Sequence, residues 1–317
     1  MKLSNKDNAN SSLKMRFTTL LLAGICSAGC LHQAAAQTDI SVQAAFDTPA
    51  EAGQALQTAS LGYDENSLGK ILGAGSNDIL SSGDPLEDKA AISSFVAKYN
   101  RMNRWVTLTD GNSILYIGAD NYPFPIPLAR DSSGKWYFDT EAGEDEMLAR
   151  RIGKNELLAI DAVSAIANAQ EIYFKTSATQ HGTQQYAQRI ISTPGKKDGL
   201  YWNAPAGQSS SPLGSLPDFI ESITAGDPQV IDGYSFRILT AQGDAAKGGS
   251  KNYLSDGHMT GGFAIIASPA KYADSGIMTF ILNRNGVVYQ KDLGENTKAV
   301  AASIKTFNPA DGWTPAE

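Results

Sequence analysis

Apolar residues recur at helical spacing in three segments of the chain. The first, Thr48–Leu61, opens with Thr48 as a helix N-cap, Pro49 at the first helical position and Glu51 at the third, the pattern of a capping box. The second, Glu87–Asn103, also has an apolar face at helical spacing. We therefore expect two helices early in the fold. The predicted packed face of the second helix is Ala91, Phe95 and Tyr99.

The third helical segment, Ile152–Phe174, is the most apolar of the three. One apolar stripe follows the helical period, and further apolar residues widen it beyond a single face. This pattern is typical of a helix that packs on most of its circumference, so we predict a buried central helix that joins two halves of the chain. The stripe is Leu158, Ala162, Ala165, Ala169 and Ile172, widened by Leu157, Ile160, Val163 and Ile166.

Four strand-like segments lie between the second and third helices. Asp110-Gly111 predicts a hairpin turn within the first pair, and Ser132-Ser133-Gly134 a turn within the second. Helices followed by an antiparallel meander indicate an α+β domain over residues 37–150, similar in element order to NTF2-like and cystatin-like folds. The segments are Trp105–Thr109, Ser113–Gly118, Phe124–Arg130 and Lys135–Asp139.

Prolines alternate at the start of the third of these strands, at Pro123, Pro125 and Pro127. Amide hydrogens two residues apart point to the same side of a strand, and proline has none. One side of this strand therefore cannot donate, so we expect an edge position or regular pairing only after Pro127. The functional alternative is a proline-ligand motif.

The second half, residues 151–317, is rich in predicted strands. Asn285-Gly286 predicts a hairpin between the last two, and Ala299–Phe307 a short terminal helix. Its element order resembles type IV pilin heads in the residues Ala169-Gln170, Tyr173, Tyr186-Ala187 and Gly233-Tyr234-Ser235-Phe236, without the long apolar N-terminal helix of pilins. We predict an α+β fold here too. The strands are Tyr234–Thr240, Phe263–Ala267, Met278–Leu282 and Val287–Lys291.

The first 36 residues have the pattern of a secretory signal peptide. Four basic residues accompany a short apolar run, Phe17–Gly29, and Ala34-Ala35-Ala36 offers a cleavage site before Gln37. The run is shorter than the roughly 18 to 20 residues that span a bilayer. Ser27-Ala28-Gly29-Cys30 is an alternative, lipoprotein-like processing site, with Ser27 where a Leu-like residue is usual. Both routes predict a periplasmic or secreted protein with no transmembrane segment in the mature chain; the second would anchor it by lipid at Cys30.

The net charge argues against some classes of partner, and the cysteine content argues against some kinds of chemistry. The chain carries a net charge of −7, and the leader contributes four basic residues and one acidic residue, or +3, so the mature chain carries −10. This acidity argues against nucleic acid or anionic membranes as partners. Both cysteines, Cys26 and Cys30, lie in the leader. A chain that begins at Gln37 therefore has no disulfide, thiolate ligand or cysteine nucleophile.

An acidic segment, Asp139–Glu146, is a first candidate site. Calcium takes several oxygen ligands, which Asp139, Glu141 and their neighbours supply, but the ordered spacing of an EF-hand is missing. The structural alternative is that these carboxylates stabilise the positive end of a helix. We assign no metal and no cofactor, and keep Asp139 and Glu141 as candidate ligand-binding residues.

Arg151, Asn155 and Glu156 form a second candidate site. Together with Arg150, Arg151 makes an arginine pair of the kind that clamps a carboxylate or phosphate through paired hydrogen bonds. The structural alternative is that these residues tie one domain to the next. The sequence leaves both readings open.

Tyr201 and Trp202 form a third candidate, as an aromatic ligand platform, with a place in the core or in an interface as the alternative.

The mature chain holds two histidines, His181 and His258, and neither an HExxH nor a G-x-S-x-G motif occurs. A triad that uses His258 remains open, because triads are spatial rather than sequential. We assign no catalytic residue.

Seven stretches carry a family resemblance: FDTPAEA, LSSGDP, PFPIPL, WYFDTEAGEDEMLARRIGKNEL, YAQRIISTPGKKDGLYW, GYSFRILTAQG and GIMTFILNRNGVVYQKDLG. In this order they are similar to an exported bacterial family known only as domain of unknown function 2950. The resemblance covers nearly the whole mature chain. It implies an envelope or secreted protein and no assigned activity.

These observations favour a non-enzymatic envelope module that binds a partner protein or a surface ligand. The alternative is a periplasmic hydrolase with a carboxylate-lined pocket in the N-terminal domain and Asp139 or Glu141 as its base. The hydrolase requires Asp139, Glu141, Arg151 and Glu156 to converge on one cavity, and this arrangement distinguishes the two hypotheses.

Overall fold

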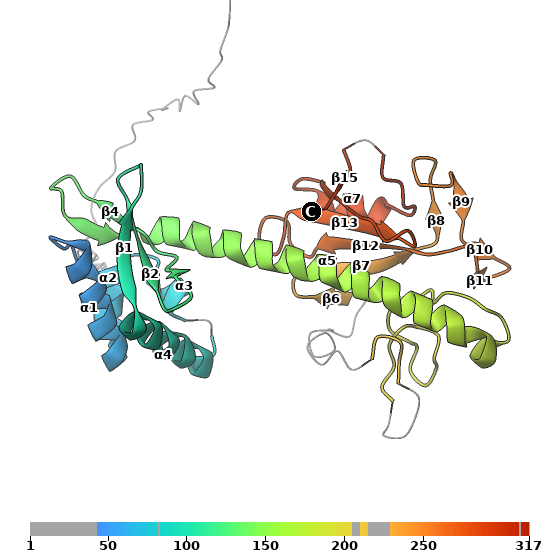
Figure 1. The fold of residues 1–317 in the computed structure, drawn as a ribbon, viewed down its shortest axis with the longest axis horizontal. Coiled ribbons are helices and arrows are strands. Elements are labelled where there is room, and N and C mark those ends of the chain that lie inside the picture. Colours follow the sequence, from blue (N-terminus) through green and yellow to red (C-terminus); the bar gives the residue numbers. More distant parts are fainter. Residues whose placement is uncertain (1–42, 82, 205–209, 215–228, 311, 317) are drawn as a thin grey trace, which may run out of the picture. The chain divides into compact units, whose positions relative to one another are not determined.

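Four helices follow one another over residues 49–101. The structure, a computed structural model, describes residues 43–81, 83–204, 210–214, 229–310 and 312–316 (Figure 1). α1 (Pro49–Gly62) begins as predicted, because Thr48 is its N-cap and accepts a hydrogen bond from the Glu51 amide at 3.2 Å. Two of the following helices were missed in the sequence. They are α2 (Glu65–Leu72) and α3 (Ser76–Leu80), and α4 (Pro85–Arg101) corresponds to the second predicted helix.

The packed face of α4 agrees with the predicted one except at Ala91. Ile92 and Phe95 pack against the core of this part, whereas Ala91 is exposed. The assignment of Ala91 to the packed face is therefore wrong, because Ile92 takes that position in the first half of the helix. Tyr99 does lie on the packed side, and its ring centroid is 5.8 Å from that of Phe95. No residue of α4 is buried.

The first sheet is antiparallel, with strand order β1-β2-β4-β5 and β3 paired with β2. In β2, Ser113, Leu115 and Ile117 are buried and alternate with half-buried residues, as expected for a sheet covered on one face. α1 and α2 pack against β5, and α4 packs against β1 and β2. The strands are β1 (Asn103–Thr107), β2 (Ser113–Ile117), β3 (Tyr122–Pro123), β4 (Leu128–Arg130) and β5 (Trp136–Phe138).

The alternating prolines act as predicted. β3 ends at Pro123, and β4 begins at Leu128, directly after Pro127. Regular antiparallel pairing with β5 then starts at Leu128, opposite Phe138. The expectation that pairing resumes only after the last proline is confirmed, because a residue without an amide hydrogen cannot donate to a neighbouring strand.

A single long helix, α5 (Thr140–His181), includes the third predicted helix and extends it at both ends. Its buried residues form one stripe, while the side chain of Leu157 is 65% exposed and that of Ile172 is 48% exposed. Leu157 and Ile172 are therefore wrongly assigned to the packed side. The exposed positions of Ile152–Phe174 fall on one face of the helix, and its other positions are buried or half-buried, as expected for a helix that packs on most of its circumference. Leucine and isoleucine also occur on its open face, so apolar composition alone overstated the burial. The buried stripe is Ala159, Val163, Ile166, Ala169, Gln170, Tyr173 and Ser177.

The second sheet is antiparallel and has the strand order β15-β14-β13-β12-β7-β6. The hairpin predicted at Asn285-Gly286 joins β13 and β14, and Gly286 has the positive φ of 80° that such a turn requires. The strands are β6 (Gln229–Ile231), β7 (Tyr234–Leu239), β12 (Ala264–Pro269), β13 (Met278–Asn283), β14 (Val288–Asp292) and β15 (Thr314–Pro315).

Two short pairs of strands lie outside this sheet. β8 (Ala241–Gln242) pairs with β9 (Lys251–Asn252), and β10 (Leu254–Ser255) pairs with β11 (His258–Met259). The glycine-rich stretch between β8 and β9 is a loop. The chain therefore has an α+β fold, with mixed helices and antiparallel sheets.

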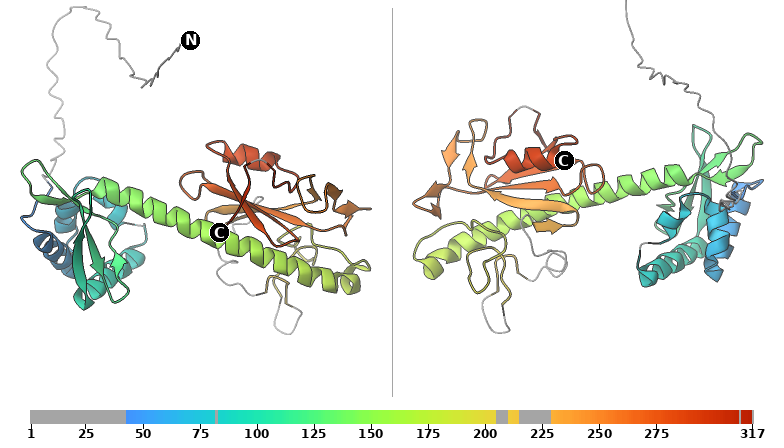
Figure 2. Two further views of the ribbon diagram at one scale, coloured as in Figure 1. Left: turned by 45° about the horizontal axis from the view of Figure 1, so that its top comes forward. Right: turned by 180° about the vertical axis from the view of Figure 1, so that it is seen from behind.

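Two helices pack on opposite faces of the second sheet. α5 contacts β7, β12, β13 and β14, and the terminal helix, which the structure places at α7 (Thr297–Ser303), contacts β12 from the other side (Figure 2). Six strands span about 24 Å, whereas a helix is about 10 Å wide. α7 therefore leaves part of its face of the sheet uncovered beside β6 and β7.

Among the described residues, no helix has the length and apolar character that a membrane crossing needs.

Candidate ligand-binding site

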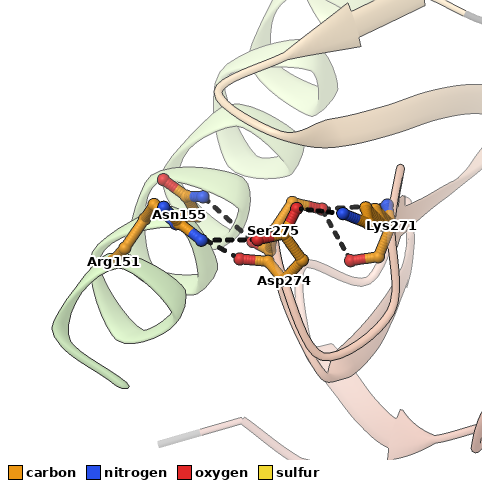
Figure 3. Close-up of polar contacts among 5 residues, drawn as sticks. All are labelled: Arg151, Asn155, Lys271, Asp274 and Ser275. Atoms are coloured by element: carbon orange, nitrogen blue, oxygen red, sulfur yellow. Dashed lines mark hydrogen bonds and ion pairs between the residues drawn. The ribbon is translucent and has the colours of Figure 1, made fainter. Parts of the chain in front are cut away.

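Two predicted site residues on α5, Arg151 and Asn155, hold one loop of the second sheet (Figure 3). Arg151 forms an ion pair with Asp274, and the Asn155 amide donates to the Ser275 carbonyl at 2.9 Å. Asp274 also pairs with Lys271, 3.1 Å away. The loop lies between β12 and β13, so these side chains fasten the helix to the sheet.

Glu156 completes this attachment. One of its carboxylate oxygens accepts hydrogen bonds from the Ile277 and Met278 amides, both at 2.9 Å. The Tyr234 hydroxyl donates to the Met278 carbonyl at 2.8 Å. Burial raises the pKa of the Tyr234 hydroxyl, and the negative charge of Glu156 raises it further. Arg151, Asn155 and Glu156 thus bond to residues 274–278 of the chain itself, within the second half and not across the predicted division at residue 150.

Asp139 and Glu141 lie at the start of α5. Asp139 is the N-cap and accepts a hydrogen bond from the Ala142 amide at 3.1 Å, while Glu141 is an exposed residue of the first turn. The rise of a helix puts about 18 Å between Asp139 and Arg151 along its axis. Asp139, Glu141, Arg151 and Glu156 do not line a common cavity among the described residues, so the arrangement that the hydrolase hypothesis requires is not formed by them.

The acidic segment also does not gather into a cation site. Within the described ranges, no group of three or more His, Asp or Glu side chains is close enough to hold a metal ion. Glu146 instead forms an ion pair with Arg150 at 2.8 Å, one helical turn away. These carboxylates lie at the N-terminal end of α5, where negative charge is favourable.

Tyr201 and Trp202 pack at the edge of the second core. Both are half-buried, and the Tyr201 amide donates to the Ile190 carbonyl at 2.8 Å. The ammonium group of Lys197 lies 5.4 Å from the centroid of the Trp202 ring. Lys197 is in turn tied to α5, because the Tyr173 hydroxyl donates to its carbonyl at 3.2 Å. The two aromatics therefore belong to the packing of this part rather than to the site around Arg151.

His258 lies in β11, where its Nδ1 is 3.0 Å from the side-chain oxygen of Gln185. No carboxylate or serine hydroxyl contacts it within the described chain, so it forms no catalytic triad there. The side chain of His181, and the leader residues Cys30 and Gln37, lie outside the described residues.

A basic groove, missed in the sequence analysis, occupies the uncovered face of the second sheet. It has a volume of about 490 Å³ and is lined by β6, β7, β12 and α7. Arg237, Lys298 and Lys305 contribute its charge, and none of the acidic residues that the structure describes lines it. Apolar side chains, among them Val230 and Ile266, form its floor. We call this feature the basic groove.

The register of the sheet places these groups together. Val230 pairs with Ser235 and Arg237 pairs with Ile266, so these residues of β6, β7 and β12 share the face on which α7 lies. Side chains two residues apart share a strand face, and Ser235 and Arg237 alternate with the buried Tyr234 and Phe236. That alternation was the one sequence signal for an outward polar face; the sequence did not show that α7 would bring two lysines beside it.

Arg237 also holds α7 in place. One of its guanidinium nitrogens donates to the Ala301 carbonyl at 2.8 Å and to the Ile304 carbonyl at 2.7 Å. Carbonyls at a helix C-terminus have no partner within the helix, and a cation there is favourable. The wall of the groove is therefore fixed by a residue of its own lining. Lys298 and Lys305 are exposed, and the Lys305 ammonium donates to the Ala302 carbonyl at 2.8 Å.

Comparison with known proteins returns a family and no nearer relative. A family model described as "Protein of unknown function (DUF2950)" matches residues 43–316, which bears out the resemblance noted in the sequence. No curated protein matches, and no solved structure matches. The likeness to NTF2-like, cystatin-like and pilin-like folds, and the division at residue 150, stay predictions.

Proposed function

We propose that this chain, which belongs to the DUF2950 family of proteins of unknown function, is a non-enzymatic, exported binding module whose ligand occupies the basic groove. The observation that carries the proposal is the charge of the groove lining. Its described residues include three cations and no carboxylate, in a chain whose net charge is −7. Neighbouring cations repel one another, and an anion bound between them would relieve this repulsion.

The groove also has the size and the floor of a ligand site. Its volume of about 490 Å³ falls within the range of roughly 300 to 1,000 Å³ that is typical of small-molecule pockets. The apolar floor gains free energy when it is covered by an apolar group, and the cations at the rim favour a negative group. The ligand class that fits is therefore an anion attached to an apolar chain or ring.

Export rests on the leader pattern, and its test is the mass of the mature N-terminus. Cleavage by the ordinary secretory route would give a chain that begins at Gln37. Cleavage at the alternative site would give a lipid-modified chain that begins at Cys30. A mass spectrum of protein recovered from the expressing cells distinguishes these products, and a chain that keeps residues 1–29 would contradict both export routes.

A charge-matched pair of amphiphiles tests the groove. We expect decanoate to bind the protein in calorimetric titration, and decyltrimethylammonium, which has the same tail and the opposite charge, to bind much more weakly. Replacing both lysines, in Lys298→Gln/Lys305→Gln, should weaken decanoate binding by about tenfold, because hydrogen bonds to charged groups contribute about 1.5 kcal/mol or more.

The matched control is Lys247→Gln, which removes an exposed lysine from the loop between β8 and β9 and should leave decanoate binding unchanged. Equal binding of both amphiphiles would contradict the proposal, as would full decanoate affinity in the double variant. Arg237 is left intact in these variants because it also holds α7.

A further inference from the structure

A second groove lies among the helices of the N-terminal part. It has a volume of about 590 Å³ and is lined by residues of α2, α3 and α4 and the segments that join them. Its apolar lining includes Leu68, Leu80 and Ile92, one from each helix. None of its lining residues belongs to the basic groove, so it is a separate surface. We call it the helical groove.

One wall of the helical groove is incompletely covered. α4 has 17 residues, and none of them is buried. In its first turn Leu86 is 79% exposed, and Leu61 and Tyr63, at the end of α1 and just after it, are 54% and 40% exposed. Single exposed apolar residues are ordinary, but several beside an apolar groove are typical of an interaction surface.

The rim of the helical groove is acidic. Glu65 and Asp88 line it, and Asp64, Asp84 and Glu87 are exposed neighbours in the sequence. Lys89 is the one basic residue among the described lining residues, and its ammonium group lies 5.4 Å from the centroid of the Tyr63 ring. The pKa of Asp64 is lowered by the hydrogen bond from the Ser67 hydroxyl, so this carboxylate stays charged in mild acid. A partner with basic residues is complementary to such a rim.

The walls of the helical groove select the backbone form of the partner. α2, α3 and α4 bond their backbone groups internally, and they offer no strand edge. An extended peptide laid against them would leave its own amides and carbonyls without partners on an apolar wall, which is costly. A helix satisfies these groups itself and presents side chains at positions i, i+3, i+4 and i+7.

From these observations we infer that the helical groove docks an amphipathic helix of a protein partner, with its apolar stripe against Leu68, Leu80 and Ile92 and basic residues facing the acidic rim. Leu86 lies at the edge of this contact and is covered when the partner binds. The inference concerns a surface other than the basic groove, so either can fail while the other stands.

Three synthetic peptides of about 18 residues test the inference against the full-length mature protein. The first is a helical Leu/Lys peptide, the second replaces each Lys by Glu, and the third is the Leu/Lys peptide with a central proline that breaks the helix. We expect the first to bind in fluorescence anisotropy at about 150 mM salt. The other two should bind at least about tenfold more weakly, because each lacks one feature of the occupant.

Matched variants locate the contact. Leu86→Ser and Leu86→Ser/Glu87→Gln should weaken binding of the Leu/Lys peptide by about tenfold or more. Leu157→Ser/Glu141→Gln removes another exposed leucine and a first-turn carboxylate from α5 and should leave binding unchanged. Equal weakening in both sets would indicate unspecific attraction to an acidic protein and would overturn the inference.

Hydrogen exchange on the unmutated protein gives a second reading that does not depend on any variant. Addition of the Leu/Lys peptide should slow exchange of amides in residues 65–101. Protection confined to α5 or α7 would place the contact elsewhere and contradict the inference. Tight binding by the proline-containing peptide would exclude a helical occupant.

Discussion

At the residue scale, Glu156 joins positions far apart in the sequence. Its carboxylate accepts from the amides of Ile277 and Met278, more than a hundred residues later in the chain. Two charge-assisted hydrogen bonds to one oxygen leave two amide groups unpaired when that oxygen is removed. The attachment of α5 to the loop between β12 and β13 therefore depends strongly on one side chain.

Glu156→Ala should lower the free energy of unfolding by about 1–3 kcal/mol, the usual cost of leaving buried amides without acceptors. Glu156→Gln keeps an acceptor oxygen and should lose less. Urea denaturation measures both. Asp161→Ala, at an exposed position of the same helix, should change stability by no more than about 0.5 kcal/mol. If both alanine variants lose the same amount, the hydrogen bonds of Glu156 are not what stabilises the loop.

Asp274 gives the same loop a pH dependence. The hydrogen bond from Lys271 lowers the pKa of this carboxyl below 3.8, and the nearby charge of Arg151 contributes. A lowered pKa means stability that is present above the unfolded value and is lost as pH falls through the folded value. Asp274→Asn should therefore be less stable than the parent at pH 7, and the difference should shrink below pH 3.8. A difference that stays constant with pH would show that the charge has no part in it.

The sequence predicted which residue types would gather near Arg151 but not their partners. Arg151, Asn155 and Glu156 follow the helical period, so their common neighbourhood was visible from spacing. That they bond to residues 274–278 depends on the register of strands that are distant in the chain, and no local pattern carries that information. For Asp139, the alternative that its carboxylate stabilises a helix N-terminus agrees with its position as N-cap of α5. This could be predicted because helix capping depends only on residues that are near in the sequence.

At the element scale, α5 shows why apolar composition is a poor guide to burial. Its buried residues follow the sequence Ala159, Val163, Ile166, Ala169 and Tyr173, a stripe of ordinary width. Leu157 and Ile172 lie outside that stripe. Where strong local rules act, as in the capping of α1 and the prolines before β4, the sequence predicted the element well. The basic groove arises only from the mismatch between a short helix and a wide sheet.

Two substitutions on α5 compare a residue of its buried stripe with a residue of its exposed face. Ile166 is fully buried, and Ile166→Ala should lower the free energy of unfolding by about 2–5 kcal/mol because it leaves a cavity. Leu157→Ala, at a position that is 65% exposed, should lower it by no more than about 0.5 kcal/mol. Urea denaturation again provides the comparison, and similar losses at both positions would mean that the face around Leu157 is packed as well.

At the scale of the whole molecule, the chain combines an acidic net charge with two grooves of opposite local sign. The helical groove has an acidic rim and the basic groove a basic one, and they share no lining residue. Net charge, calculated from the sequence, therefore indicated the acidic groove but not the basic one. The net charge also did not help to predict the fold class, because net charge influences which partners a protein binds and not how its chain folds.

The two grooves should bind independently. A saturating concentration of decanoate should change the dissociation constant of the Leu/Lys peptide by less than about twofold, since no residue is common to both sites. Both affinities should fall as salt is raised, because both depend on charge at an exposed rim. Titration of the peptide with and without decanoate measures the coupling, and direct competition would mean that the two ligands share one site.

The last described strand has a practical consequence for anyone who shortens this protein. β15 is only two residues long, yet it closes one side of the second sheet by pairing with Tyr289 and Gln290 of β14. A version truncated before Trp313 would present β14 with its amides and carbonyls unpaired, and such an open strand recruits other chains. Truncated preparations should therefore self-associate, and a purification tag is better extended beyond the C-terminus than substituted for its final residues.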